Sequence, residues 1–158
     1  NALNHFANIA NRQNFPDNRN EAGAGAAGGL GFALMTFLSA TLTGGFQLVS
    51  EFSNLEQMIQ QADLVITGEG KMDFQTSMGK VASGVLSLAK AVNVPVIAIC
   101  GVVDDPRSHW KDDGFTIAIP SIQTLGSLDE ALALAKQNVE KTAYNIAMAM
   151  QLGQQLNR

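Results

Sequence analysis

Three short apolar runs, separated by a segment with helical periodicity, limit the fold of this chain more than any other feature. The runs cover residues 64–67 (LVIT), 95–100 (PVIAIC) and 115–119 (FTIAI). Between the first two, residues 78–92 place apolar side chains three or four positions apart, as an amphipathic helix does. Strands that alternate with helices predict βαβ units, and strands that are apolar throughout predict a sheet covered on both faces. We therefore expect an α/β fold with a parallel, or mixed, sheet flanked by helices, similar to Rossmann or flavodoxin folds.

Other periodic segments predict the helices that flank this sheet. They cover residues 2–11, 26–40 and 46–61. A long last helix is expected after Ser127, because Ser127 and Glu130 stand in the spacing of a capping box. Its buried face is expected to carry Leu132, Ala135, Val139, Ala143, Ile146 and Met150.

Composition excludes several classes of protein. The chain has 158 residues, of which 46% are apolar and 15% charged, so we expect a folded protein. The net charge is −4 and the sequence contains no basic patch, and both observations argue against a nucleic acid partner. The single cysteine, Cys100, rules out a disulfide framework, and we expect a cytoplasmic protein. The chain opens on Asn inside a helical pattern, so we also expect it to be a piece of something longer.

An uncharged stretch over residues 22–50 is long enough to cross a bilayer, which takes about 20 apolar residues. The stretch contains seven glycines, and acidic residues flank it, Glu21 and Glu51. No cluster of Lys or Arg is present to orient a membrane span. A buried helix is therefore the better interpretation, and we expect no membrane association.

The segment GEGKMDFQTSMGK, residues 68–80, concentrates charged and polar groups directly after the first apolar run. In parallel sheets, ligands bind beyond the carboxyl ends of the strands. Glu69 and Asp73 could hold Mg²⁺ or accept a proton, and Lys80 could neutralise phosphate charge. Backbone amides over residues 76–79, at the start of the next helix, could hold an anion. The alternative is a capped turn with solvated charges.

The glycine-rich segment 23–28 matches the dinucleotide fingerprint G-x-G-x-x-G letter for letter. The fingerprint requires a strand just before it, and the polar residues 16–21 do not form a buried strand. A Walker A motif is also missing from the sequence. What remains is a loop that lets an anion or another backbone approach closely, or one that serves packing alone.

Together the two segments resemble bacterial type I glycerate kinases. The resemblance rests on GAGAAGGLGFAL, on ADLVITGEGKMDFQTSMGK with its pattern TGEG-x-x-D-x-QT-x-x-GK, and on VPVIAICG, FTIAIPSI and SLDEALALAKQNVEKTAYNIA. It covers residues 22–147, and the opening ALNHFA also fits; Ala22 stands where the family usually has proline. Two other motifs of the family, D-S-F-K-G and D-G-G-E-G-T, are absent, so the resemblance is to the C-terminal part only.

The resemblance implies a two-domain α/β kinase that uses ATP and Mg²⁺ to phosphorylate D-glycerate to 2-phosphoglycerate. Residues 1–45 would end a second, inserted domain, and residues 46–158 would be the C-terminal part of the Rossmann-like domain, with the N-terminal half missing. Catalytic roles would fall to Asp73, Glu69 and Lys80, with Asp73 and Glu69 also holding the metal. Substrate or phosphate would contact Gly25, Gly28, Gly29, Gly68, Gly70, Gln75 and Thr76.

A non-catalytic α/β module that binds a small molecule or nucleotide is the alternative function. Against it, the crowding of charge around Glu69, Asp73 and Lys80 has no structural purpose. The sequence is compatible with a homo-oligomer and does not determine the oligomeric state.

Most other polar or reactive residues favour structural roles. Asp104 and Asp105 follow the second apolar run at its carboxyl end and could border the site, but a solvated loop is the favoured interpretation. We expect Cys100 buried and inert, and no metal site at His5 or His109. Four methionines are expected as core filler: Met35, Met58, Met148 and Met150.

Overall fold

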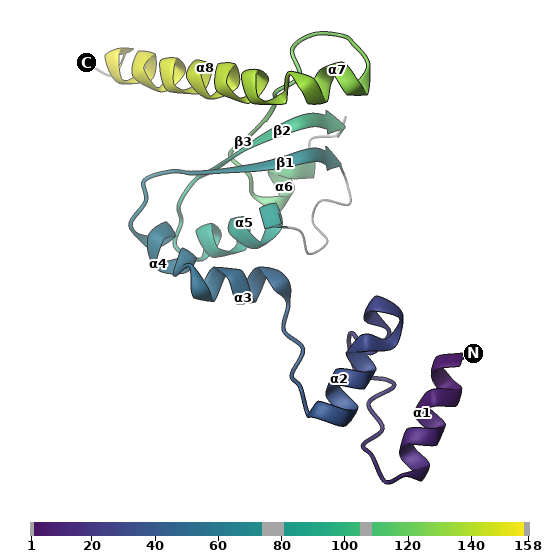
Figure 1. The fold of residues 1–158 in the computed structure, drawn as a ribbon. Coiled ribbons are helices and arrows are strands. Elements are labelled where there is room, and N and C mark those ends of the chain that lie inside the picture. Colours follow the sequence, from purple (N-terminus) through teal and green to yellow (C-terminus); the bar gives the residue numbers. More distant parts are fainter. Residues whose placement is uncertain (1, 74–80, 105–108, 157–158) are drawn as a thin grey trace. The chain divides into compact units, whose positions relative to one another are not determined.

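The computed structural model describes residues 2–73, 81–104 and 109–156 (Figure 1). The chain divides into two compact units, residues 1–48 and residues 49–158. In the described residues no helix is long and apolar enough to cross a membrane.

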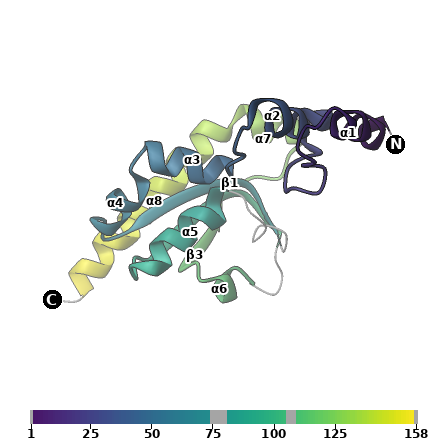
Figure 2. The same cartoon turned by 90° about the horizontal axis from the view of Figure 1, so that it is seen from below.

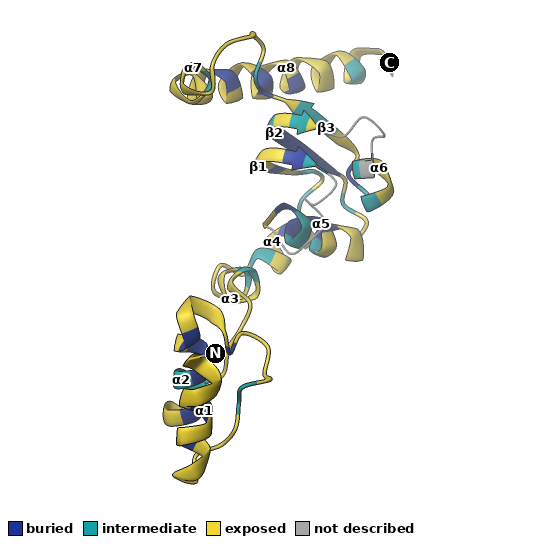
Figure 3. Cartoon of the chain, turned by 90° about the vertical axis from the view of Figure 1, so that its right-hand side faces the viewer, coloured by how far each residue is buried: buried dark blue, intermediate teal, exposed yellow. Residues whose placement is uncertain are grey.

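The first unit contains two helices joined by a glycine-rich connection. Helix α1 (Ala2–Arg12) and helix α2 (Leu30–Leu38) share a small core, coloured dark blue in Figure 3. A 3₁₀ turn (Ala26–Gly29) precedes α2, where the sequence predicted a helix from residue 26. Ala27, Gly28 and Gly29 have positive φ, which an α-helix does not allow. The core is formed by Ala7, Ala10, Ala24 and Phe32, with Met35 packed against them as expected.

The second unit is built on three parallel strands in the order β1-β2-β3: β1 (Val65–Asp73), β2 (Val96–Asp104) and β3 (Ile117–Pro120). Val65 pairs with Val96 and the register continues to Asp73, which pairs with Asp104. Ile97 pairs with Ile117 on the other side of β2. The predicted α/β fold with a parallel sheet is confirmed.

Helices cover both faces of the sheet, as Figures 1 and 2 show. On one face lies α5 (Val81–Ala91), which carries the expected amphipathic pattern and buries Ala82, Val85, Leu86 and Ala89. On the other lie α7 (Leu128–Ala133) and α8 (Ala135–Leu156). Three shorter helices complete the chain: α3 (Gly45–Phe52), α4 (Leu55–Gln60) and α6 (His109–Asp113).

The two long strands extend beyond the predicted ranges. The sequence predicted strands over 64–67 and 95–100 because apolar residues end there, yet pairing holds both strands in extended form to residues 73 and 104. Asp104 therefore ends a strand, and its expected place in a loop was wrong.

Two predicted helices are interrupted in the structure, and one helix was not predicted. The helix expected over 46–61 is two helices, because Asn54 takes a left-handed φ of 52° between them. The single last helix is interrupted at Leu134, after the capping box of Ser127 and Glu130, which is present. Helix α6 was not predicted, since its residues are polar.

The predicted buried face of the last helix was only partly correct. Ile146 is buried, together with the polar Asn138 and Thr142. Leu132, Val139 and Met150 are exposed, and so are Met58 and Met148, so these three methionines are not core filler in the described residues. Large exposed apolar surfaces commonly bind another part of a protein or a ligand.

Strands β1 and β2 approach each other most closely where two glycines meet. A Cβ atom placed on Gly101 would overlap the carbonyl oxygen of Gly70. Because that oxygen is backbone, it cannot swing away as a flexible side chain could. The pairing of the two strands therefore depends on glycine at position 101.

We expect Gly101→Ala to lower the free energy of unfolding of the full-length protein by about 1–3 kcal/mol, since overpacking forces the backbone to move. Gly153→Ala in α8 is the control, because a Cβ there meets nothing within 4 Å. The control should be neutral or stabilising by up to about 1 kcal/mol. Chemical denaturation measures both, and equal stability of the two variants would contradict the steric argument.

Candidate functional site

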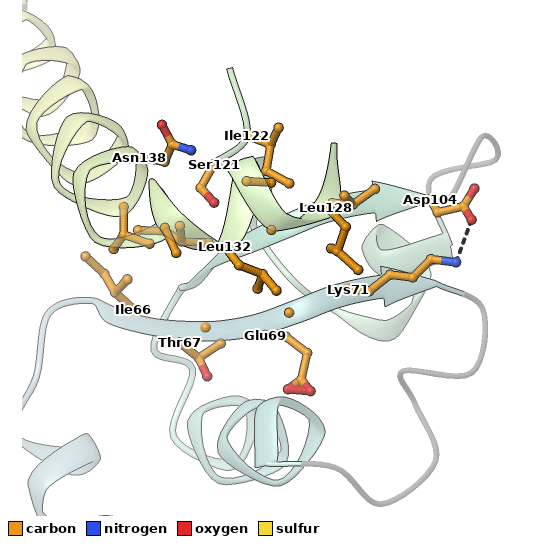
Figure 4. A pocket seen from close by; sticks show the side chains of 18 residues that line it. Ile66, Thr67, Glu69, Lys71, Asp104, Ser121, Ile122, Leu128, Leu132 and Asn138 are labelled. Carbon is orange, nitrogen blue, oxygen red and sulfur yellow. Dashed lines mark ion pairs between the residues drawn. The ribbon is translucent and has the colours of Figure 1, made fainter. Parts of the chain in front are cut away.

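A cavity of about 800 Å³ lies between the sheet and helices α7 and α8, within the second unit (Figure 4). Strand β1 contributes residues 66–71 to its lining, and Gly68 and Gly70 carry no side chain to fill it. Leu128, Leu132 and Val139 form much of the opposite wall. Concave, mostly apolar sites of this size bind small molecules in many proteins.

Two polar side chains from separate elements interrupt the apolar lining. Ser121 follows β3 and is 5% exposed, and Asn138 lies on α8 and is 7% exposed. The backbone N–H of Ser121 donates a hydrogen bond of 2.6 Å to the carbonyl oxygen of Cys100, which holds this turn against β2. A few polar groups in an apolar cavity are what orient a bound ligand.

A charged cluster lies at the carboxyl ends of β1 and β2. Lys71 Nζ is 2.8 Å from Asp104 Oδ2 and 3.7 Å from Asp73 Oδ2. Lys71 and Asp104 also line the cavity, and the dashed line in Figure 4 marks their ion pair. The hydrogen bond from Lys71 to Asp104, followed by the charges of Asp104 and Asp73, raises the pKa of Lys71. Lys71 thus stays protonated beside two carboxylates.

The Asp73 side chain is the least exposed of the three, at 21% against 53% for Lys71 and 60% for Asp104. The residue that the sequence ranked first is thus the inner member of the cluster. Its location at a strand end is the one at which open α/β sheets place ligands.

Glu69 lies on the other face of β1. Figure 4 shows its side chain on the opposite side of the strand from Leu132. Its register partner is Cys100, which is fully buried as expected. Burial, and to a lesser extent the charge of Glu69, raises the pKa of the Cys100 thiol to about 11. The thiol is therefore neutral near pH 7, in agreement with an inert cysteine.

Extended backbone separates the two carboxylates that were predicted to hold Mg²⁺. Four residues of strand span about 13 Å, at about 3.3 Å per residue, so the Cα atoms of Glu69 and Asp73 are far apart. The carboxylate beside Asp73 is Asp104, its register partner. Among the described residues no group of three or more His, Cys, Asp or Glu could hold a metal. Mg²⁺ is commonly bound by one or two carboxylates plus substrate phosphates, which fits Asp73 with Asp104 better than Asp73 with Glu69.

The remaining predicted site residues lie elsewhere. Gly25, Gly28 and Gly29 belong to the first unit, where Gly29 is buried and the other two are exposed. Gln75, Thr76, Lys80 and Asp105 fall outside the described residues, and so does the side chain of His109. The metal and substrate roles given to these residues stay predictions.

Sequence reasoning missed Lys71, Ser121 and Asn138, and it placed Asp104 in the wrong kind of structure. The signal that could have found Lys71 is its place in the charged segment 68–80, close to Asp73. Asn138 gave no such signal, since a polar residue in a helix is usually exposed.

A parallel α/β sheet with a cavity against β1 and charged groups at the ends of β1 and β2 is typical of a protein that binds a small molecule beyond its strands. Comparison with known proteins refines this class. The family model described as the glycerate kinase family matches residues 1–151. The chain belongs to this family, and the resemblance indicated by the motifs is confirmed.

Individual relatives agree with the family model. A glycerate kinase from Haemophilus influenzae is 42% identical over 149 residues, which are 94% of this chain and 39% of that protein. A glycerate 2-kinase from Escherichia coli is 39% identical over 153 residues, 97% of this chain and 40% of that protein. A crystal structure from Salmonella typhimurium LT2, provisionally assigned as a glycerate kinase 2, superposes with a TM-score of 0.75 at 42% identity, covering 98% of this chain and 39% of that one. The chain thus spans about two fifths of the length of these relatives.

We expect Cys100 to resist alkylation in the folded full-length protein. At pH 8 a thiol with a pKa of about 11 is about 100-fold less ionised than one with a pKa of 9.0, and burial slows the reaction further. Iodoacetamide labelling of the peptide that contains Cys100, followed by mass spectrometry, should be slow in buffer and fast in urea. Equal rates in the two conditions would show that the thiol is neither buried nor raised in pKa.

Proposed function

We propose that the full-length protein containing this chain is an ATP-dependent kinase that phosphorylates D-glycerate, with Mg²⁺, to 2-phosphoglycerate. One observation carries the proposal: the TGEG-x-x-D segment forms strand β1, and this strand lines a cavity to which it also contributes Lys71, whose ammonium lies 3.7 Å from Asp73. Relatives named glycerate kinase support the reaction, and the name of the Escherichia coli relative supports position 2 as the phosphorylated hydroxyl.

The residues of β1 suit the demands of phosphoryl transfer, which needs positioning and charge stabilisation more than covalent chemistry. Asp73 would orient the attacking hydroxyl of glycerate and accept its proton. Gly68 and Gly70 let a ligand approach the strand backbone, because neither puts a side chain into the cavity. Lys80, Gln75 and Thr76 are proposed to contact phosphate or glycerate, and Gly25, Gly28 and Gly29 to donate backbone amides.

Mg²⁺, when bound with ATP, would neutralise the charge that develops on the transferred phosphoryl group. Asp73 is the proposed ligand in this chain, and the geometry makes Asp104 a better second carboxylate than Glu69. Glu69 instead pairs in register with Cys100, and its side chain lies on the side of β1 opposite to Leu132. A cytoplasmic location is part of the proposal and rests on the single free thiol, Cys100.

The activity itself is tested with purified full-length protein, ATP, Mg²⁺ and D-glycerate. We expect stoichiometric formation of ADP and a phosphoglycerate whose ³¹P and ¹H spectra identify the 2-isomer. Binding of either substrate without turnover would favour the alternative, a non-catalytic binding module. Formation of 3-phosphoglycerate would keep the kinase and correct the position.

We expect Asp73→Asn to lower kcat of the full-length enzyme by about 10²–10⁴-fold, because the amide can neither accept a proton nor carry the charge of a carboxylate. Asp63→Asn is a matched control, since Asp63 is exposed and precedes the same strand at its amino end. Steady-state assays and circular dichroism of both variants make the comparison. Near-normal turnover of Asp73→Asn would remove this residue from the mechanism.

A further inference from the structure

Lys71, Asp73 and Asp104 meet at the carboxyl ends of β1 and β2. The two printed distances place the Lys71 ammonium beside both carboxylates. Asp104 joins them because it is the register partner of Asp73 on β2. Two like charges at opposed positions repel each other across strands, and here a cation lies beside both.

The two contacts of Lys71 are unequal. Its Nζ is at hydrogen-bond distance from Asp104, 2.8 Å, and at a longer, electrostatic distance from Asp73, 3.7 Å. Asp104 therefore holds the Lys71 ammonium in place. The ammonium puts a positive charge next to the Asp73 carboxylate, which is less exposed than that of Asp104.

We propose that Lys71 is a positioning residue for Asp73, held in place by Asp104 and keeping the Asp73 carboxylate oriented at the end of β1. The proposal rests on the proposed kinase function, in which Asp73 contacts the reacting hydroxyl. Lys71 acts through Asp73 and does not bind the substrate, because its ammonium is already engaged by the two carboxylates.

The positioning role predicts a specific kinetic signature in the full-length enzyme. Lys71→Gln removes the charge but keeps a side chain of similar length, and a small misplacement of a catalytic group costs up to about 10²-fold in rate. We expect kcat to fall by about 10-fold to 10²-fold while the KM values for D-glycerate and ATP change little. Lys71→Arg should restore most of kcat, since it returns the positive charge.

Two further variants complete the series. Lys136→Gln removes an exposed lysine that pairs with Glu140 at 3.9 Å on α8, and it should leave kcat unchanged. Asp104→Asn weakens the anchor and should lower kcat in the same direction as Lys71→Gln, with the dependence of kcat on Mg²⁺ concentration unchanged. This variant tests the proposal even if Lys71→Gln fails to fold, since a changed Mg²⁺ dependence would assign the loss to the metal and overturn the anchoring role.

A double-mutant cycle separates positioning from a general effect on the fold. If Lys71 acts through Asp73, then Lys71→Gln should cost no further activity in an Asp73→Asn background. Additive losses would overturn the proposal, and so would a raised KM with unchanged kcat, which would make Lys71 a substrate-binding cation. If the wild-type enzyme is active and the losses are additive, only this inference fails. If the wild-type enzyme does not phosphorylate D-glycerate, the proposed function fails first.

Discussion

The parallel pairing of β1 with β2 is the interaction on which the second unit depends. The pairing extends from Val65 and Val96 to Asp73 and Asp104, so the carboxyl ends of both strands lie at the same edge of the sheet. The pairing holds the polar TGEG segment extended where its composition alone favours a loop. It also demands glycine at position 101, because the backbone of Gly70 leaves no room for a Cβ atom. Helices α5, α7 and α8 then cover the two faces that this pairing creates.

Because a strand points its side chains to alternate faces, one short segment serves several purposes. Gly68 and Gly70 keep the cavity beneath α7 and α8 open. Glu69 lies on the other face beside Cys100. Lys71 and Asp73 reach the strand end, where Asp104 completes a charged cluster. This segment therefore carries many charged and polar residues because it contributes to both faces and to one end of a single strand.

The cavity and the charged cluster are adjacent but chemically different. The cavity is lined mainly by apolar groups, with Ser121 and Asn138 as buried polar exceptions, and Lys71 and Asp104 lie at its charged end. A site of this kind suits a ligand with an apolar or flat part and a charged part, as a nucleotide has. Exposed apolar side chains of α7 and α8, among them Leu128 and Leu132, border the same space.

The sequence by itself determined the class of fold and the family. Apolar runs and helical periods are local patterns, and they report burial on both faces of a strand or one face of a helix without knowledge of the partner. Glycine, carboxylate and lysine at fixed spacing in residues 67–80 likewise identify the family from short-range order alone. Cys100 was correctly expected to be buried for the same reason, because apolar residues surround it in the chain.

Only the tertiary structure decided which of these residues meet. Asp73 lies beside Asp104 and away from Glu69, because strand register joins positions that are about 30 residues apart in sequence while extended backbone separates positions only four apart. The same register places two carboxylates beside Lys71. Packing of α8 against the sheet buries Asn138 and leaves Val139 exposed. Strand pairing and helix packing join residues that are far apart in the sequence, so no local sequence pattern predicts them.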